Sequence, residues 1–299
     1  TTLGAKGDGI TDNTAFIQKA IDDCSARKGG TVEIPSGHFL TRTLFLKSNV
    51  NLHLHFGAEL LGSTDLDSYH KVFPELKGKE SPALIFARGV ANIAITGSGT
   101  INGQGAHQNF QHGNDSKGGP RRPKIIYFIG CNNVRVQDVT LRNSAYWTQD
   151  YEKCNGVIVR GVKVYSHANW NNDGLDIDSR NVVVSDCYID CDDDALCLKS
   201  DTDTPCENVT VTNCVLKSNC NAIKFGTSSY SGFKNVTISN CTIDRASEDH
   251  IRQWYKNYPW IGTKHKTVVA GIALESVDGG IIENVSISDI AMQRNRSEE

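Results

Sequence analysis

A short phrase, an asparagine followed by alternating β-branched residues, recurs along the chain at nearly constant spacing. Copies begin at Asn181, Asn208 and Asn235, so two successive intervals are 27 residues each. The other copies begin at Asn92, Asn133, Gly156 (a weaker one) and Asn284. Each copy alternates apolar and other residues with period two, as a strand does. A short period built from strands predicts a parallel β-solenoid, in which each repeat is one coil stacked on its neighbours.

Equivalent positions of successive coils should stack on one another. Cys187, Cys214 and Cys241 each follow their asparagine by six residues and are 27 residues apart. We therefore expect an interior column of small apolar thiols in place of disulfides. The repeated asparagines should likewise form ladders of amide hydrogen bonds.

The chain ends and one interruption also follow from the repeat. An amphipathic pattern over residues 11–27 predicts a helix that covers the open first coil, as a solenoid requires. Residues 245–266 break the rhythm with aromatic and basic side chains and are expected to be an inserted loop. Such a loop either binds a ligand or packs its aromatics on the solenoid flank. The whole of residues 1–299 is expected to be one domain.

Composition excludes several classes of protein. The formal net charge of −3 lacks the basic excess of a nucleic-acid-binding protein. No apolar run approaches the roughly 20 residues that a membrane-spanning helix needs. Aromatic and β-branched residues are spread along the chain, which excludes disorder.

The densest acidic region has two parts about one coil apart. Asp173, with Asp176 and Asp178 close behind, precedes the pair Asp193 and Asp194 by 20 and 21 residues. Because neighbouring coils rise by roughly 4.8 Å, these carboxylates are expected to face one small area. Like charges so close raise one another's pKa, which indicates a functional site. A calcium site and a solvated acidic corner are the alternatives.

At these residues the chain resembles glycoside hydrolase family 28, the polygalacturonase and rhamnogalacturonan hydrolase family. The run from Asn171 to Gly174 resembles its Asn-Thr-Asp-Gly signature, and the run from Asp193 to Ser200 its Asp-Asp block. The runs 4–14, 143–148 and 271–287 are also similar to members of the family. The resemblance implies an all-β fold, a right-handed parallel β-helix with an N-terminal capping helix.

The resemblance also implies roles for the acidic residues. Asp193 would be the general acid, and Asp173 and Asp194 would hold and deprotonate the water of an inverting hydrolysis. Lys199 would either keep the cluster ionised and touch an acidic sugar or serve as a structural counter-charge. The expected substrate-binding residues are Asn171, Lys199, Asn221, Lys224, Trp147, Gln149, Asp150 and Trp170. Trp147 is alternatively a core residue, and His167 is a candidate to support the acid.

Two family motifs are missing. No histidine stands near 219–222, where Gly-His-Gly is expected, and no cation stands at 272–274, where Arg-Ile-Lys is expected. The second motif grips a galacturonate carboxylate, so we expect rhamnogalacturonan or another decorated pectic chain as substrate. Pectic polysaccharide or oligosaccharide is the expected partner, with no nucleic acid and no membrane.

Other functions stay open at this point. A calcium-dependent pectate lyase would use Lys199 or Lys224 as the base and the acidic cluster as the metal site. A non-catalytic carbohydrate-binding β-helix would keep the acids without turnover. For the hydrolase no cofactor or metal is expected. We expect a secreted or periplasmic monomer from which a signal peptide has been removed.

Overall fold

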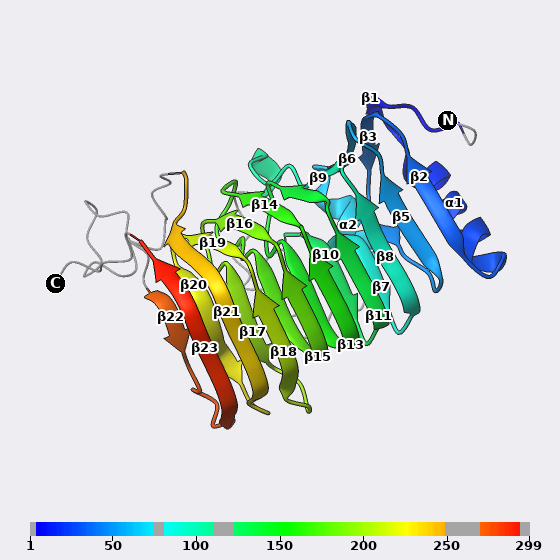
Figure 1. Ribbon diagram of the computed structural model, residues 1–299. Coiled ribbons are helices and arrows are strands. Elements are labelled where there is room, and N and C mark those ends of the chain that lie inside the picture. The colour runs from blue at the N-terminus through cyan, green and yellow to red at the C-terminus, as the bar shows by residue number, and fades with distance from the viewer. Residues whose placement is uncertain (1–3, 74–80, 111–121, 249–269, 294–299) are drawn as a thin grey trace.

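The computed structural model describes residues 4–73, 81–110, 122–248 and 270–293. Strands account for 57% of the structure and helices for 9%, and every strand pairing is parallel. The coils form one elongated stack, a right-handed parallel β-helix (Figure 1). The all-β fold expected from the repeat is confirmed.

Each coil contributes strands to three sheet faces. Face 1 contains β4 (Leu44–Phe45), β7 (Ala83–Arg88), β10 (Lys124–Ile129), β13 (Gln149–Arg160), β15 (Leu175–Ser185), β17 (Leu196–Ser200), β20 (Asn221–Ser229) and β22 (Ala270–Leu274). Face 2 contains β2 (Gly30–Ile34), β5 (Val50–Leu54), β8 (Ala91–Gly97), β11 (Asn132–Gln137), the later parts of β13 and β15, β18 (Cys206–Thr212), β21 (Phe233–Arg245) and β23 (Ile282–Met292). Face 3 contains β1 (Asp8–Asp12), β3 (Gly37–Thr41), β6 (Ala58–Gly62), β9 (Thr100–Asn102), β12 (Thr140–Arg142), β14 (Lys163–Ser166), β16 (Tyr188–Cys191), β19 (Val215–Ser218) and the end of β21.

The register between coils stacks equivalent side chains. In face 2, Val157 pairs with Val182, which pairs with Val209, which pairs with Val236. All four are buried, and they belong to one continuous apolar core inside the coils. Burial of such a column removes apolar surface from water along the whole stack and stabilises each coil through its neighbours.

The N-terminal helix covers the first coils. Helix α1 spans Thr14–Ala26 and buries Ile17 and Ile21 against β2, β4 and β5. It begins three residues later than expected, because Thr11 and Asp12 belong to β1. Two shorter helical segments lie in loops, α2 (Leu66–Val72) and the 3-10 turn η1 (Gln108–Phe110).

The cysteine column is present. Cys187, Cys214 and Cys241 are buried at equivalent positions, and the backbone N–H of the residue after Cys214 bonds the carbonyl of Cys187 at 2.9 Å. All ten cysteines of the chain are free thiols. The stacked arrangement therefore replaces disulfides, as the spacing predicted.

Asparagine ladders run along the outside of the same coils. The side-chain amide of Asn208 donates to Asn181 at 3.0 Å, and Asn235 donates to Asn208 at 2.9 Å. These three residues have φ between 54° and 56°, a left-handed conformation that asparagine tolerates well. At the equivalent place Gly156 has φ 73° and no side chain, and the preceding Asn155 accepts the amide of Asn181 at 2.7 Å instead.

Most of the inserted loop expected at 245–266 lies outside the described residues. Its start is described: β21 ends at Arg245 and residues 246–248 follow. In the described part of the chain, no helix is long and apolar enough to cross a membrane.

Candidate active site

The acidic residues lie where face 3 strands turn into face 1 strands. The turn between β14 and β15 carries Asp173, and the next turn, between β16 and β17, carries Asp193 and Asp194. The N–H of Gly174 donates to the carbonyl of Asp194 at 2.8 Å, which ties the two turns together. A side chain at Gly174 would clash, because an added Cβ would lie 2.3 Å from Ile189. Parallel stacking thus brings the three predicted carboxylates together.

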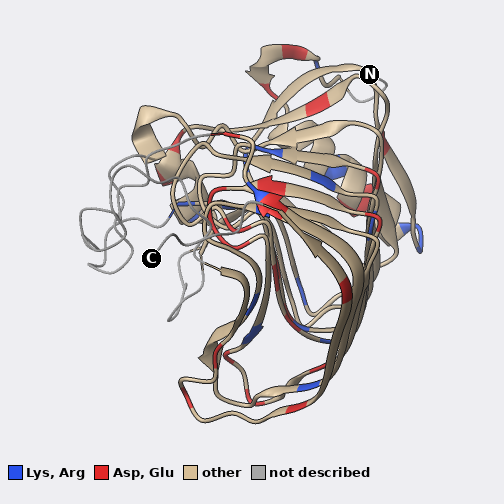
Figure 2. Ribbon diagram, turned by 60° about the vertical axis from the view of Figure 1, so that its left-hand side comes forward, with Lys and Arg blue, Asp and Glu red and all other residues tan. Residues whose placement is uncertain are grey.

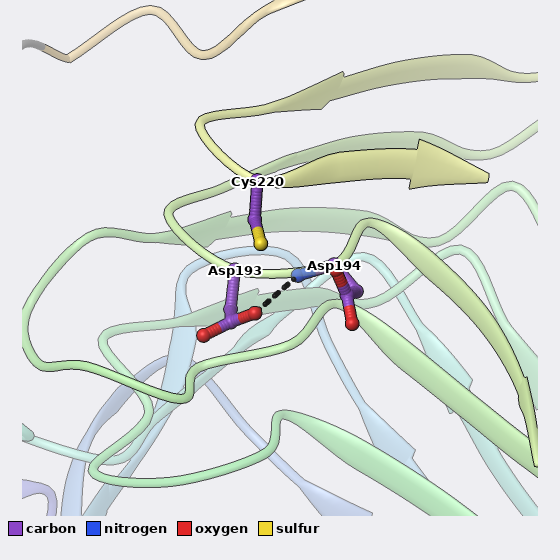
Figure 3. Close-up of side chains that lie close together, drawn as sticks. All are labelled: Asp193, Asp194 and Cys220. Carbon is purple, nitrogen blue, oxygen red and sulfur yellow. Dashed lines mark hydrogen bonds between the residues drawn. The ribbon is translucent and has the colours of Figure 1, made fainter. Parts of the chain in front are cut away.

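The pair Asp193 and Asp194 is held by backbone and side-chain contacts (Figure 3). The carboxylate of Asp193 accepts the N–H of Asp194 at 3.0 Å, and the hydroxyl of Ser218 donates to the carbonyl of Asp193 at 2.6 Å. Asp193 is 9% exposed and Asp194 3%. Asp193 is therefore the more open of the pair.

Asp194 is bound by two residues of the following coil. Asn221 donates its side-chain amide to Asp194 Oδ1 at 2.7 Å, and Lys224 Nζ lies 3.1 Å from Asp194 Oδ2. Lys224 also lies 4.0 Å from Glu275. Burial alone would lower the pKa of Lys224, but Asp194, Cys197 and Glu275 raise it above its ordinary value. This lysine therefore carries a charge that balances Asp194.

Asp173 shares a second lysine with Asp176. Lys199 Nζ lies 3.2 Å from Asp176 Oδ1 and 3.9 Å from Asp173 Oδ2. Burial raises the pKa of Asp173 well above its ordinary value, Asp176 and Asp193 add to the rise, and Lys199 opposes it. Burial likewise raises the pKa of Asp176 to about 7. Asp173 Oδ1 is buried without a hydrogen-bond partner among the described residues.

A third lysine extends this charged group. Lys124 is fully buried, pairs with Asp150, and lies 4.3 Å from the ring centroid of Trp147. Lys199 lies 4.4 Å from the same centroid, so two ammonium groups contact one indole. Acidic and basic positions adjoin near the middle of the coil stack in Figure 2. Trp147 is half-buried, and its contact with substrate stays a prediction.

The structure places Gln149 away from this group. Gln149 pairs in register with Ile126, which belongs to the apolar core. It is fully buried, receives a hydrogen bond from the Tyr151 hydroxyl at 3.0 Å, and donates to the Gly174 carbonyl at 3.2 Å. The expected position of Gln149 beside the cleft is therefore corrected: alternation along β13 turns it inward and Asp150 outward.

His167 forms a separate cluster near the acids. Its ring nitrogens lie 3.1 Å from Asp192 and 3.1 Å from Asp190. Burial alone would lower the pKa of His167, but its hydrogen bonds with Asp190 and Asp192 raise it to about 9. With Glu248 and three coil-corner amides, it also lines a cavity of about 620 Å³. A supporting role for His167 toward Asp193 stays a prediction.

The positions of the missing motifs are occupied by other side chains. Asn221 stands on Asp194, and Cys220 has its sulfur within 4.8 Å of carboxylate oxygens of Asp193 and Asp194 (Figure 3). Two carboxylates and a thiol suit a borderline or soft metal better than calcium. Where the uronate-gripping motif was expected, Ala273 pairs in register with Lys224. The nearest described cation therefore stands one coil earlier.

Sequence reasoning missed two buried cations of this region, Lys124 and Arg122. Arg122 is 1% exposed, and its guanidinium bonds the carbonyl of Trp170 at 2.7 Å and the side chain of Asn171 at 3.2 Å. Its partners come from coils 23 to 49 residues further along the chain, so no local pattern could reveal it.

These features define a class: parallel β-helices that carry a buried carboxylate group at the turn into one sheet face. Comparison with known proteins then identifies the family. The model of glycosyl hydrolases family 28 matches residues 24–277, and the chain belongs to this family.

Relatives of known name agree with this assignment. A probable polygalacturonase of Vitis vinifera is 32% identical over 217 residues, which cover 67% of this chain and 44% of the relative. An exo-poly-alpha-D-galacturonosidase of Dickeya chrysanthemi is 30% identical over 247 residues, 66% of this chain and 40% of the relative. The family 28 exopolygalacturonase structure of Yersinia enterocolitica matches with a TM-score of 0.76 at 25% identity, over 97% of this chain and 58% of that one. The chain spans less than half the length of the two curated relatives.

Proposed function

We propose that this protein hydrolyses glycosidic bonds of a pectic polysaccharide with inversion at the anomeric carbon. The observation that carries the proposal is the group of three buried carboxylates, Asp173, Asp193 and Asp194, on two adjacent coils. Membership of family 28 and relatives named as polygalacturonases support the same reaction. Cleavage by a pair of carboxylates needs one in the acid form and another ionised.

The roles follow from what each carboxylate contacts. Asp193 is the most exposed of the three and would protonate the leaving oxygen. Asp194, ion-paired with Lys224, would hold the attacking water. Asp173 would share this water and accept its proton, with Lys199 opposing the protonation that burial favours. In the inverting arrangement the acid and base carboxyls stand roughly 6.5–9.5 Å apart, which leaves room for the water.

For the substrate we propose rhamnogalacturonan or another decorated pectic chain in preference to plain polygalacturonan. The support is the apolar run at 272–274 and the pairing of Lys224 with Asp194 and Glu275. A cation that already has two carboxylate partners attracts a substrate carboxylate weakly. We further propose a monomer that acts outside the cytoplasm, where such polymers occur.

A panel of pectic polysaccharides tests this proposal, with products separated by chromatography. Asp193→Asn should lower turnover by about 10³-fold or more while binding is retained, because the variant keeps the shape of the acid without its proton. Brisk cleavage of polygalacturonic acid with rhamnogalacturonan untouched would overturn the substrate preference. Equal turnover by Asp193→Asn and the wild type would overturn the mechanism.

The same assay separates hydrolysis from elimination. A hydrolase yields saturated products, whereas a lyase yields an unsaturated uronide that absorbs in the ultraviolet. We expect saturated products and activity that survives a chelator. Ultraviolet-absorbing products that disappear with the chelator would identify a metal-dependent lyase.

A further inference from the structure

Arg122 joins loops of three successive coils next to the catalytic group. It lies just before β10, and its Nη1 is 2.9 Å from the Ala145 carbonyl, 2.9 Å from Asn169 Oδ1 and 2.7 Å from the Trp170 carbonyl. Its guanidinium carbon lies 5.1 Å from the ring centroid of Tyr146 and 5.5 Å from that of Trp170. The planar guanidinium is suited to such simultaneous stacking and hydrogen bonding.

The contacts of Arg122 extend to a fourth coil through Asn169. The amide nitrogen of Asn169 donates to the carbonyls of Gly105 and Phe110 at 3.0 and 3.1 Å, while its oxygen accepts from Arg122. Asn169 is therefore bonded at both ends of its amide. The segment that leads to Asp173 is thus fastened through Asn169 and Trp170.

The last contact of Arg122 determines how Asn171 is oriented. Arg122 Nη2 lies 3.2 Å from Asn171 Oδ1. A guanidinium has only donors, so the amide oxygen of Asn171 must face it and the NH₂ group must face away. Asn171 is exposed, has φ 51°, and stands two residues before Asp173. Its NH₂ group is therefore held toward solvent beside the catalytic turn.

We propose that Arg122 is a positioning residue that presents the Asn171 NH₂ group as a hydrogen-bond donor to an acceptor oxygen of the bound sugar. This inference rests on the proposed function, since it assumes that the sugar chain passes over the Asp173 turn. The acceptor is a uronate carboxylate or a hydroxyl oxygen, which share this chemistry.

The structural half of the proposal is tested by thermal unfolding, without any substrate. Arg122→Lys, Asn171→Asp and the double variant form a cycle. Asn171→Asp should keep or raise Tm when Arg122 is present, because a carboxylate accepts both guanidinium donors. In the Arg122→Lys background the same substitution should lower Tm relative to that outcome, because a lysine cannot form the paired contact. Additive changes in Tm would overturn the contact.

The functional half is tested by the KM of Asn171→Asp, which keeps the contact with Arg122 but loses the donor. We expect KM to rise about 10-fold with kcat within about twofold, the loss typical of one hydrogen bond to substrate. Asn240→Asp is the matched control, because Asn240 has a similar left-handed conformation (φ 53°) and, among the described contacts, its side chain bonds Asn213 at 2.8 Å in a separate asparagine pair. Its KM should be unchanged.

Pectic oligosaccharides with native and with reduced carboxyl groups distinguish the two acceptors. A larger rise on the native substrate identifies the carboxylate, and an equal rise identifies a hydroxyl; either supports the proposal. Unchanged KM on both overturns it. Binding to the Asp193→Asn variant, compared with turnover by the wild type, separates the two hypotheses. Saccharide that the variant binds but the wild type never hydrolyses defeats the proposed function alone, and saccharide that neither protein binds defeats both.

Discussion

Two rows of polar side chains run along this β-helix, and they differ in almost every physical respect. In the outer ladder, asparagines such as Asn181 and Asn208 are identical, neutral and exposed, and each amide donates to the next. On face 1, the aligned positions read Tyr127, Asp150, Asp176, Cys197 and Lys224, which are mixed, charged and mostly buried. The same stacking geometry therefore produces a neutral hydrogen-bonded ladder in one place and a buried charged row in another.

The difference shows what stacking does to charge. Identical amides satisfy one another because each has a donor and an acceptor. Identical carboxylates would repel, so the two acids of the face 1 row are paired with lysines from outside it, Asp150 with Lys124 and Asp176 with Lys199, and burial raises the pKa of Asp176 to about 7. Repeated identical side chains stabilise the asparagine ladder, whereas different side chains at stacked positions give the face 1 row its charged groups.

Removal of one lysine should disturb the face 1 row most. We expect Lys199→Met to lower kcat at neutral pH by roughly 10²-fold, because Asp173 would stay protonated and could not act as a base. Since the lysine opposes the raised pKa of Asp173, its loss should move the acid limb of the pH–rate profile to higher pH. Lys199→Arg, which keeps the charge, should leave the limb near its original place. A limb that does not move in Lys199→Met would refute this role.

The buried acid Asp178 should make stability depend on pH. Burial raises its pKa to about 7, so the folded chain holds a proton that the unfolded chain releases near pH 4. Its contribution to stability is complete below the unfolded pKa and is lost as pH rises toward 7. Asp178→Asn should shrink the stability difference between about pH 4.5 and about pH 7.5 by about 2 kcal/mol.

Urea unfolding at the two pH values measures this change. Asp186→Asn is the matched control, because Asp186 is fully exposed and its pKa is lowered by hydrogen bonds from Asn213 and Ser185. Its effect should have the opposite sign and appear only at acidic pH. Identical pH dependence in wild type and Asp178→Asn would contradict the interpretation.

The coil that contains Gly156 allows the smallest test. Asn181 already donates to Asn155 there at 2.7 Å. Gly156→Asn should stabilise the fold by about 0.5–1 kcal/mol, because the backbone is already left-handed and the new amide can extend the ladder toward Asn133. There is room, since an added Cβ would lie 3.7 Å from the nearest atom, of Asn133. Gly156→Ala, with the same strain and no amide, should destabilise it in thermal unfolding. If both variants destabilise equally, amide pairing does not stabilise the ladder.

The regular parts of this molecule could be predicted from the sequence, because each coil repeats its neighbour's pattern. The strand phrases, the thiol column and the grouping of Asp173 with Asp193 and Asp194 all follow from the 27-residue spacing and the rise of one strand per coil. The family resemblance suggested roles for these carboxylates but did not give their positions relative to one another.

Side chains in and after irregular turns could not be placed from the repeat spacing. The turn from Asn143 to Thr148 separates two strands, so the inward direction of Gln149 depends on where alternation restarts in β13. Arg122 follows no repeat at all, and its partners are recognisable only after several coils are wound. Tertiary contacts of a single polar side chain leave no periodic signal.

The site is divided between coils, with Asp173 on one turn and Asp193 and Asp194 on the next. Asn221 and Lys224, which bind Asp194, belong to strand β20 of the following coil. One coil can be exchanged for another, because successive coils meet through the same asparagine hydrogen bonds at Asn181, Asn208 and Asn235. Exchange of residues 209–235 for an equivalent coil of a relative would replace the partners of Asp194 and leave all three acids in place. In such a molecule, substrate preference can change by replacement of a single coil.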